Sequence, residues 1–79
     1  MMSQTVHDAI NRQINSELSA SYAYLAMSAW CERNHFTGSA QWLRAQSREE
    51  HAHALRLLDF LLARDSSQPV GGAIMRGHL

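Results

Sequence analysis

The 79-residue chain contains no lysine, one cysteine, one proline and four glycines, and no apolar run approaches the ~20 residues of a membrane span. The lone cysteine, Cys31, cannot form an internal disulfide, which excludes the disulfide-stapled class of small secreted domains. Hydrophobic residues make up 46% of the chain, too many for a linker or a disordered segment. We therefore expect one small folded domain.

The chain also lacks an excess of positive or negative charge. Seven arginines balance seven acidic residues, so the chain lacks the basic stripe that neutralises nucleic-acid phosphates, and nucleic acid is not an expected partner. The stretch from Met1 to Ile10 lacks the basic and apolar regions of a signal peptide. A cytoplasmic protein without a membrane segment is the resulting expectation.

Two long stretches without proline or glycine carry helical periodicity. Apolar or small residues recur three or four positions apart in both stretches, which predicts amphipathic helices over about 3–34 and 39–64, the first starting at Ser3 or Thr5. Pro69 closes the second stretch. The sequence thus predicts a helical hairpin over 1–68 and a flexible C-terminal tail over 69–79.

The expected fold class is all-α, an antiparallel two-helix hairpin joined by a short loop. An isolated hairpin of this size does not offset the conformational entropy of its chain, about 1–2 kcal/mol per residue for the backbone. Two hairpins packed face to face would close a core as a four-helix bundle, and a two-fold pair is the commonest arrangement of identical chains. We expect a homodimer as the minimum unit.

Polar residues interrupt the predicted apolar seams. The seam residues at 3,4 spacing are Ile10, Ile14, Glu17, Ser21, Tyr24, Ser28 and Cys31 in the first helix, and Leu43, Gln46, Glu50, His53, Leu57 and Phe60 in the second. Glu17, Glu50 and His53 therefore point inward. Counted from the loop at 1.5 Å per residue, they lie within about one turn of the same height and form one layer.

Buried carboxylates need compensation, and no arginine lies on either seam. A two-fold dimer would hold four carboxylates and two imidazoles in this layer, and two divalent ions would balance the carboxylate charge. Glu50 and His53, three positions apart, can grip one ion together, and such mixed ligands suit Fe(II) or Mn(II). The alternative is a hydrogen-bonded polar layer that only fixes the dimer register.

At these residues the chain resembles the bacterial non-haem ferritins, over residues 3–63. The motifs that carry the resemblance are Ala9-Ile10-Asn11-x-x-Ile14-Asn15-x-Glu17-Leu18, Tyr22-x-Tyr24-Leu25-x-Met27-Ser28-Ala29 and Phe36-x-Gly38-x-Ala40-x-Trp42-Leu43-Arg44-x-Gln46-x-x-Glu49-Glu50-x-x-His53-Ala54. They look like the first and second helices of that family. A full ferritin has two further helices that complete the centre, and we expect dimerisation to restore that half of the site.

The resemblance implies a ferroxidase that oxidises Fe(II) with O2. It implies Glu17 as a terminal ligand, Glu50 as a bridging ligand, His53 as the nitrogen ligand, Tyr24 beside the site and Glu49 near a third, outer iron site. Two irons per dimer would be shared between chains, with Mn or Zn as substitutes, and no haem is implied. Catalytic residues would then be Glu17, Glu50, His53 and Tyr24.

Several alternatives stay open on the sequence alone. Tyr24 could instead be a packed core residue, and Glu49 a solvated surface carboxylate. His7, His35 and His78 read as solvated residues, Cys31 as a small buried hydrophobe, and Trp30 and Trp42 as residues at an interface or core edge.

The tail over 69–79 is either idle or docks on a shell or partner protein. For the whole chain, the rival of a ferroxidase is a non-catalytic helical interaction module that pairs with a full-length ferritin-like partner.

Overall fold

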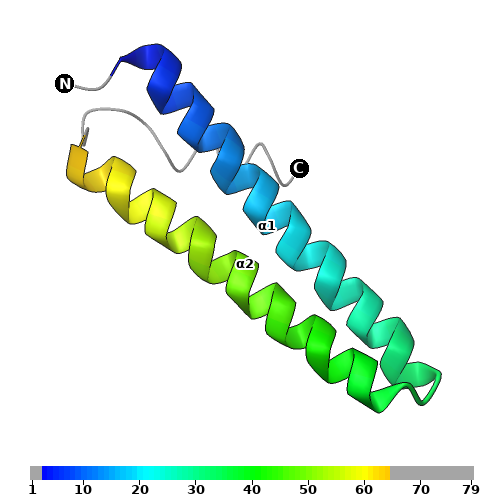
Figure 1. Ribbon diagram of the computed structural model, residues 1–79. Helices are drawn as coiled ribbons and strands as arrows, with labels where there is room; N and C mark the ends of the chain where they lie inside the picture. Colours follow the sequence, from blue (N-terminus) through cyan, green and yellow to red (C-terminus); the bar gives the residue numbers. More distant parts are fainter. Residues whose placement is uncertain (1–2, 65–79) are drawn as a thin grey trace.

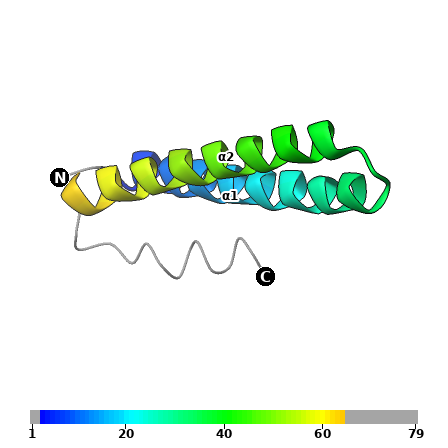
Figure 2. The same cartoon turned by 90° about the horizontal axis from the view of Figure 1, so that it is seen from below.

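A computed structural model describes residues 3–64, which form two helices, α1 (Gln4–Arg33) and α2 (Thr37–Arg64). The helices run antiparallel and lie side by side along their whole length, as both views show (Figures 1 and 2). The predicted all-α hairpin is confirmed. Helix α2 begins two residues before the expected start, and the predicted tail over 69–79 lies outside the described residues.

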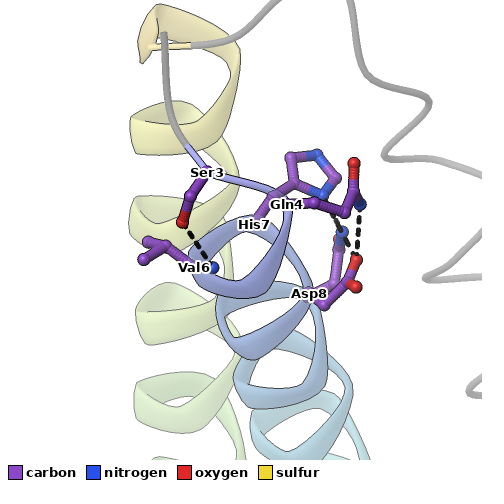
Figure 3. A network of polar contacts seen from close by, with 6 residues as sticks. Ser3, Gln4, Val6, His7 and Asp8 are labelled. Atoms are coloured by element: carbon purple, nitrogen blue, oxygen red, sulfur yellow. Dashed lines mark hydrogen bonds and ion pairs between the residues drawn. The ribbon is translucent and has the colours of Figure 1, made fainter.

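The N-terminus of α1 is capped by Ser3, one of the two predicted starts. Its Oγ accepts a hydrogen bond from the backbone N–H of Val6 at 3.2 Å (Figure 3), and its carbonyl accepts from the N–H of His7 at 3.0 Å. The side chain of Gln4 donates to Asp8 at 2.8 Å one turn on. The bond to Ser3 Oγ satisfies one of the backbone N–H groups that an uncapped helix leaves free.

A Schellman motif ends α1 without a glycine. The N–H of Phe36 donates to the carbonyl of Cys31 at 2.8 Å and that of His35 to Glu32 at 3.2 Å, with His35 in the left-handed region at φ 63°. The rings of Trp30 and Phe36 stack with centroids 5.9 Å apart across this turn. The carbonyl of Phe36 then accepts the first helical bond of α2, which is why α2 starts early.

We expect His35→Gly to stabilise the hairpin by about 0.5–1 kcal/mol. A residue with a Cβ is strained in the left-handed conformation of His35, whereas glycine adopts it without strain. Glycine loses more conformational entropy on folding, which offsets part of the gain. Thermal unfolding monitored by circular dichroism would measure the gain. His35→Ala, which keeps the Cβ, is the control, and an equal gain in that variant would contradict the backbone explanation.

The interface between the helices repeats every seven residues. Buried or half-buried positions follow this spacing in both helices: His7, Ile14, Ser21 and Ser28 in α1, and Ala40, Ser47, Ala54 and Leu61 in α2. Ser21 and Ser47 each donate from Oγ to the other's carbonyl at 2.8 Å, and their Oγ atoms lie 2.9 Å apart. Small residues here let the two backbones approach closely and fix the antiparallel register.

The predicted seam of α2 is displaced from this interface. Leu43, Glu50 and Leu57 are only half-buried, whereas Ala54 and Leu61 are 2% and 0% exposed. Phe60 was predicted to face inward, but it is 42% exposed, with the guanidinium of Arg64 5.1 Å from its ring centre. The predicted seam included Ser21 of α1 but missed Ser47 and Ala54 of α2, because serine and alanine contribute little to a hydropathy pattern.

The interpretation of His7 as a solvated residue is wrong. Its side chain is 3% exposed, and the side-chain amide of Asn11 lies 3.0 Å from its Nδ1. His7 lies one heptad before Ile14, so its backbone position directs it into the helix interface. Cys31 is half-buried, while Trp30 and Trp42 stay 54% and 58% exposed and pack against Phe36 and Tyr24.

The hairpin leaves many large apolar side chains at its surface. Those among the described residues are Val6, Tyr22, Leu25, Met27, Trp30, Phe36, Trp42, Leu55, Phe60 and Leu62. Neither described helix is both long and apolar enough to cross a membrane.

Candidate metal centre

Three metal-ligating side chains converge midway along the hairpin. Glu17 comes from the middle of α1, and Glu50 and His53 come from successive turns of the same face of α2. One potential ligand atom from each lies within 4.8 Å of the others, and all three side chains are half-buried. The antiparallel register of the hairpin therefore brings together residues that are 33 or more positions apart in sequence.

Contacts on both sides position the carboxylate of Glu17. Its Oε1 accepts a hydrogen bond at 2.8 Å from the side-chain amide of Gln13, one turn earlier. Its Oε2 lies 3.5 Å from Nδ1 of His53 and, among the described residues, has no hydrogen-bond donor although the atom is buried. The sequence interpretation missed Gln13, although its i,i+4 spacing from Glu17 is the signal for such a bond.

Glu17 and Glu50 shift each other's pKa in opposite directions in the metal-free site. Hydrogen bonding to Glu50, helped by the bond from Gln13, lowers the pKa of Glu17. Hydrogen bonding to Glu17, then burial and the neighbouring negative charge, raises the pKa of Glu50 above its ordinary value of 4.5. Of the two carboxyl groups, Glu50 is therefore the one that takes up a proton first as the pH falls.

This donor set fits a divalent transition-metal ion. Two carboxylates and one imidazole at half-buried positions supply oxygen and nitrogen donors of the kind that iron, manganese and zinc accept. The buried Oε2 of Glu17, which lacks a donor, has the unfilled lone pairs that a cation would use. Three donors from one hairpin leave coordination positions open for further ligands.

The structure separates the other two proposed site residues from this group. Tyr24 is half-buried two turns along α1 from Glu17, and its ring packs edge-on against Trp42 with centroids 6.4 Å apart. Glu49 is exposed, and its negative charge has only a small effect on the pKa of Glu50. Neither belongs to the converging group.

Comparison with known families agrees with this geometry. The family described as "Ferritin-like domain" matches residues 7–74, which include both helices' ligand positions. The chain belongs to the ferritin-like domain family. This confirms the resemblance seen in the sequence motifs.

Relatives of this ferritin-like chain carry the name "Bacterial non-heme ferritin". Proteins of that name from Bacteroides fragilis, Campylobacter jejuni and Escherichia coli are 42%, 41% and 41% identical over 64, 66 and 61 residues, covering 81%, 84% and 77% of this chain. The alignments cover 40%, 40% and 37% of those relatives, so the ferritin-like chain spans about 40% of their length. No solved structure matches it significantly.

The opposite pKa shifts of Glu17 and Glu50 predict a pH optimum for the metal-free protein. The raised pKa of Glu50 contributes stability at low pH that is lost as the pH rises through it, and the lowered pKa of Glu17 contributes stability that is lost as the pH falls through it. The pair should therefore stabilise the fold most at a pH between the lowered pKa of Glu17 and the raised pKa of Glu50.

Unfolding measured with a chelator present, across the acidic to neutral range, would test this. The double variant Glu17→Gln with Glu50→Gln removes both titrating groups and serves as the reference. The difference in unfolding free energy between the parent and the double variant should peak in mildly acidic solution and shrink on either side. A difference independent of pH would contradict the opposite pKa shifts of Glu17 and Glu50.

Proposed function

We propose that paired copies of this chain bind Fe(II) at Glu17, Glu50 and His53 and pass its electrons to O2, as a ferroxidase in iron storage or detoxification. The observation that carries the proposal is the convergence of these three side chains in a member of the ferritin-like domain family. The name shared by its relatives supports the choice of iron.

Pairing follows from the ligand count and from the exposed apolar surface. One hairpin offers three donors and leaves Val6, Met27 and Trp42 about half exposed. Two copies together would offer four carboxylates and two imidazoles, a set that two divalent ions neutralise within a core of low dielectric. The homodimer is therefore the smallest unit that completes both the core and the centre.

Each residue has a distinct part in this proposal. Glu50, whose pKa is raised in the metal-free protein, would be an anionic ligand when iron binds. Gln13 orients Glu17, so that Oε2 faces the metal position, and His53 supplies the nitrogen donor. Tyr24, two turns along α1 from Glu17, would act on the centre from the next layer, and Glu49 would hold iron at an outer position.

An anaerobic Fe(II) titration of metal-free protein, followed by native mass spectrometry, tests the proposal. We expect one iron per chain, bound to a dimer, and rapid growth of near-ultraviolet ferric absorbance when air is admitted. The same titration with Mn(II) and Zn(II) measures the selectivity, because these ligands accept several divalent ions. We also propose that the protein is cytoplasmic and that the ferric product is stored, and both can be tested in cells.

A non-catalytic helical interaction module that pairs with a full-length ferritin-like partner is the competing function, and the exposed apolar side chains of the hairpin, which a partner chain would cover, favour it. In that case the polar layer would only fix the register of helices from a partner chain. Oxidation no faster than that of free Fe(II), in a protein that binds no stoichiometric iron, would reject the ferroxidase in favour of this module.

A further inference from the structure

Two buried polar side chains near the start of α1 have hydrogen-bonding atoms without a partner. His7 is 3% exposed and Asn11 is 7% exposed, and Nδ2 of Asn11 lies 3.0 Å from Nδ1 of His7. In the described part of the chain, Nε2 of His7 and Oδ1 of Asn11 are buried and have no hydrogen-bond partner. Neither residue is among the three converging metal ligands, so the proposed function does not use them.

The contact between the two side chains determines what the pair can still bind. An amide nitrogen only donates, so Nδ1 of His7 accepts from Asn11, and the neutral ring carries its proton on Nε2. This leaves Nε2 as a donor and Oδ1 of Asn11 as an acceptor. In the flipped orientation of the amide the roles exchange, and the pair still offers one donor and one acceptor. Oδ1 of Asp8, 3.8 Å from Nδ1, is beyond hydrogen-bond distance.

The main chain of one extended residue matches this pair. Its N–H and C=O point to the same side, as they do where two antiparallel residues exchange both of their hydrogen bonds. The C=O would accept from Nε2 of His7, and the N–H would donate to Oδ1 of Asn11. Buried polar atoms in folded proteins nearly always have such partners, because an unpaired one destabilises the fold.

The burial of Asn11 is confined to one end of the hairpin. Asn11 lies outside the seven-residue repeat of α1 that forms the helix interface. Tyr22 lies three turns further along α1 on the same side as Asn11, and it is 71% exposed. This side of α1 is therefore covered near the start of the helix and open nearer the loop.

The chain leaves α2 at that same end. The hydroxyl groups of Ser21 and Ser47 are hydrogen-bonded across the interface. Seventeen residues further from the loop along each helix, Gln4 of α1 lies level with Arg64 of α2. Figure 1 shows the blue start of α1 and the yellow-orange end of α2 at one end of the hairpin.

The segment that follows Arg64 is long enough to reach the pair. Asn11 is seven residues beyond Gln4, about 10 Å along α1, and the axes of packed helices are about 8–10 Å apart. An extended chain covers about 3.3 Å per residue, so six or seven residues after Arg64 span the path and the turn that it needs.

That count ends at residues suited to the contact. Pro69 has no N–H and cannot make both bonds, whereas residues 70–72 each have the N–H and the C=O. Gly71 and Gly72 also lack a Cβ, which allows their backbone to come close to buried side chains. A segment attached beside its site binds at a high effective concentration, which favours it over a second copy of the chain.

We infer that residues 65–79 turn back from the end of α2 and lie against α1, where the main chain of one residue among 70–72 binds Nε2 of His7 and Oδ1 of Asn11. The inference is independent of the proposed function, because the pair is separate from the metal ligands. The occupant is a segment of this chain, and a second copy or a buried water molecule would be the other ways to satisfy the pair.

Nuclear magnetic resonance of the metal-free full-length chain tests the inference. We expect nuclear Overhauser effects between the His7 ring and residues 70–72, and amide exchange there at least about tenfold slower than in an unstructured peptide. Isotope-filtered spectra of mixed labelled and unlabelled chains should show these effects only within one chain. Effects between chains would overturn the inference in favour of a second copy. A ring that contacts only water, with residues 65–79 exchanging as fast as a free peptide, would also overturn it.

Asn11→Leu removes the acceptor at nearly constant size. We expect it to abolish the slow amide exchange of residues 70–72, while the exchange of both helices stays slow. Arg12→Leu is the matched control, because this exposed neighbour on α1 gains the same side chain outside the pair. Slow exchange of residues 70–72 that survives in Asn11→Leu would show that the pair does not hold the segment. The contacts of the His7 ring in the unaltered chain decide the question independently of whether either variant folds.

Discussion

Replacing Glu50 by Gln is expected to abolish stoichiometric Fe(II) binding while leaving the hairpin folded. The amide of Gln has nearly the shape of the Glu50 carboxyl and can donate a hydrogen bond to the carboxylate of Glu17, so the contact between the two residues can be kept. The amide cannot become the anionic ligand that the metal needs. Even residues behind the ligands change metal affinity by about 10–100-fold, so loss of the ligand itself should lower iron affinity at least about 100-fold.

Asp59→Asn is the matched control, because it neutralises an exposed carboxylate on the same helix, away from the three ligands. Calorimetric titration of both variants with Fe(II) under anaerobic conditions, and circular dichroism of the metal-free proteins, would separate binding from folding. Retention of one tight iron per chain in the Glu50 variant would show that this residue is not a ligand.

Leu61→Ala is expected to destabilise the protein by about 2–5 kcal/mol, enough to unfold a domain of this size. Leu61 is 0% exposed and packs in the core cluster with Ile14 and Ala54. Truncation removes its apolar contacts and leaves a cavity that rigid neighbouring helices do not fill completely. Denaturant unfolding of the variant and the parent at equal chain concentration gives the difference.

Leu62→Ala, one residue further along α2, provides the comparison. The side chain of Leu62 is 51% exposed, so the same truncation should cost less than about 1 kcal/mol. Equal losses in the two variants would mean that the face carrying Leu62 is buried in the assembled protein as deeply as the hairpin core.

Much of the fold and of the candidate site followed from the sequence. Long stretches without proline, with apolar residues at helical spacing, required helices, and a short loop required that they be antiparallel neighbours. Equal distances from that loop then placed Glu17 beside Glu50 and His53, because rise per residue is nearly constant in a helix.

The depth of burial did not follow from the sequence. The hydroxyl groups of Ser21 and Ser47 are hydrogen-bonded across the interface, and Ala40 is fully buried. A hydropathy pattern gives such small residues little weight. His7 is buried in the interface although its side chain is polar, because its position in the helix points toward α2. Phe60 stayed outside because the interface turned toward Leu61.

The amino-acid sequence by itself determined two helices, their antiparallel pairing and the level at which the ligands meet, since these depend on local backbone geometry and on counting residues. Only the tertiary structure decided which side of each helix is buried, that Gln13 holds Glu17, and that the pKa values of Glu17 and Glu50 shift in opposite directions. Those features depend on distances between side chains of different helices, and a shift of one residue in packing changes every one of them.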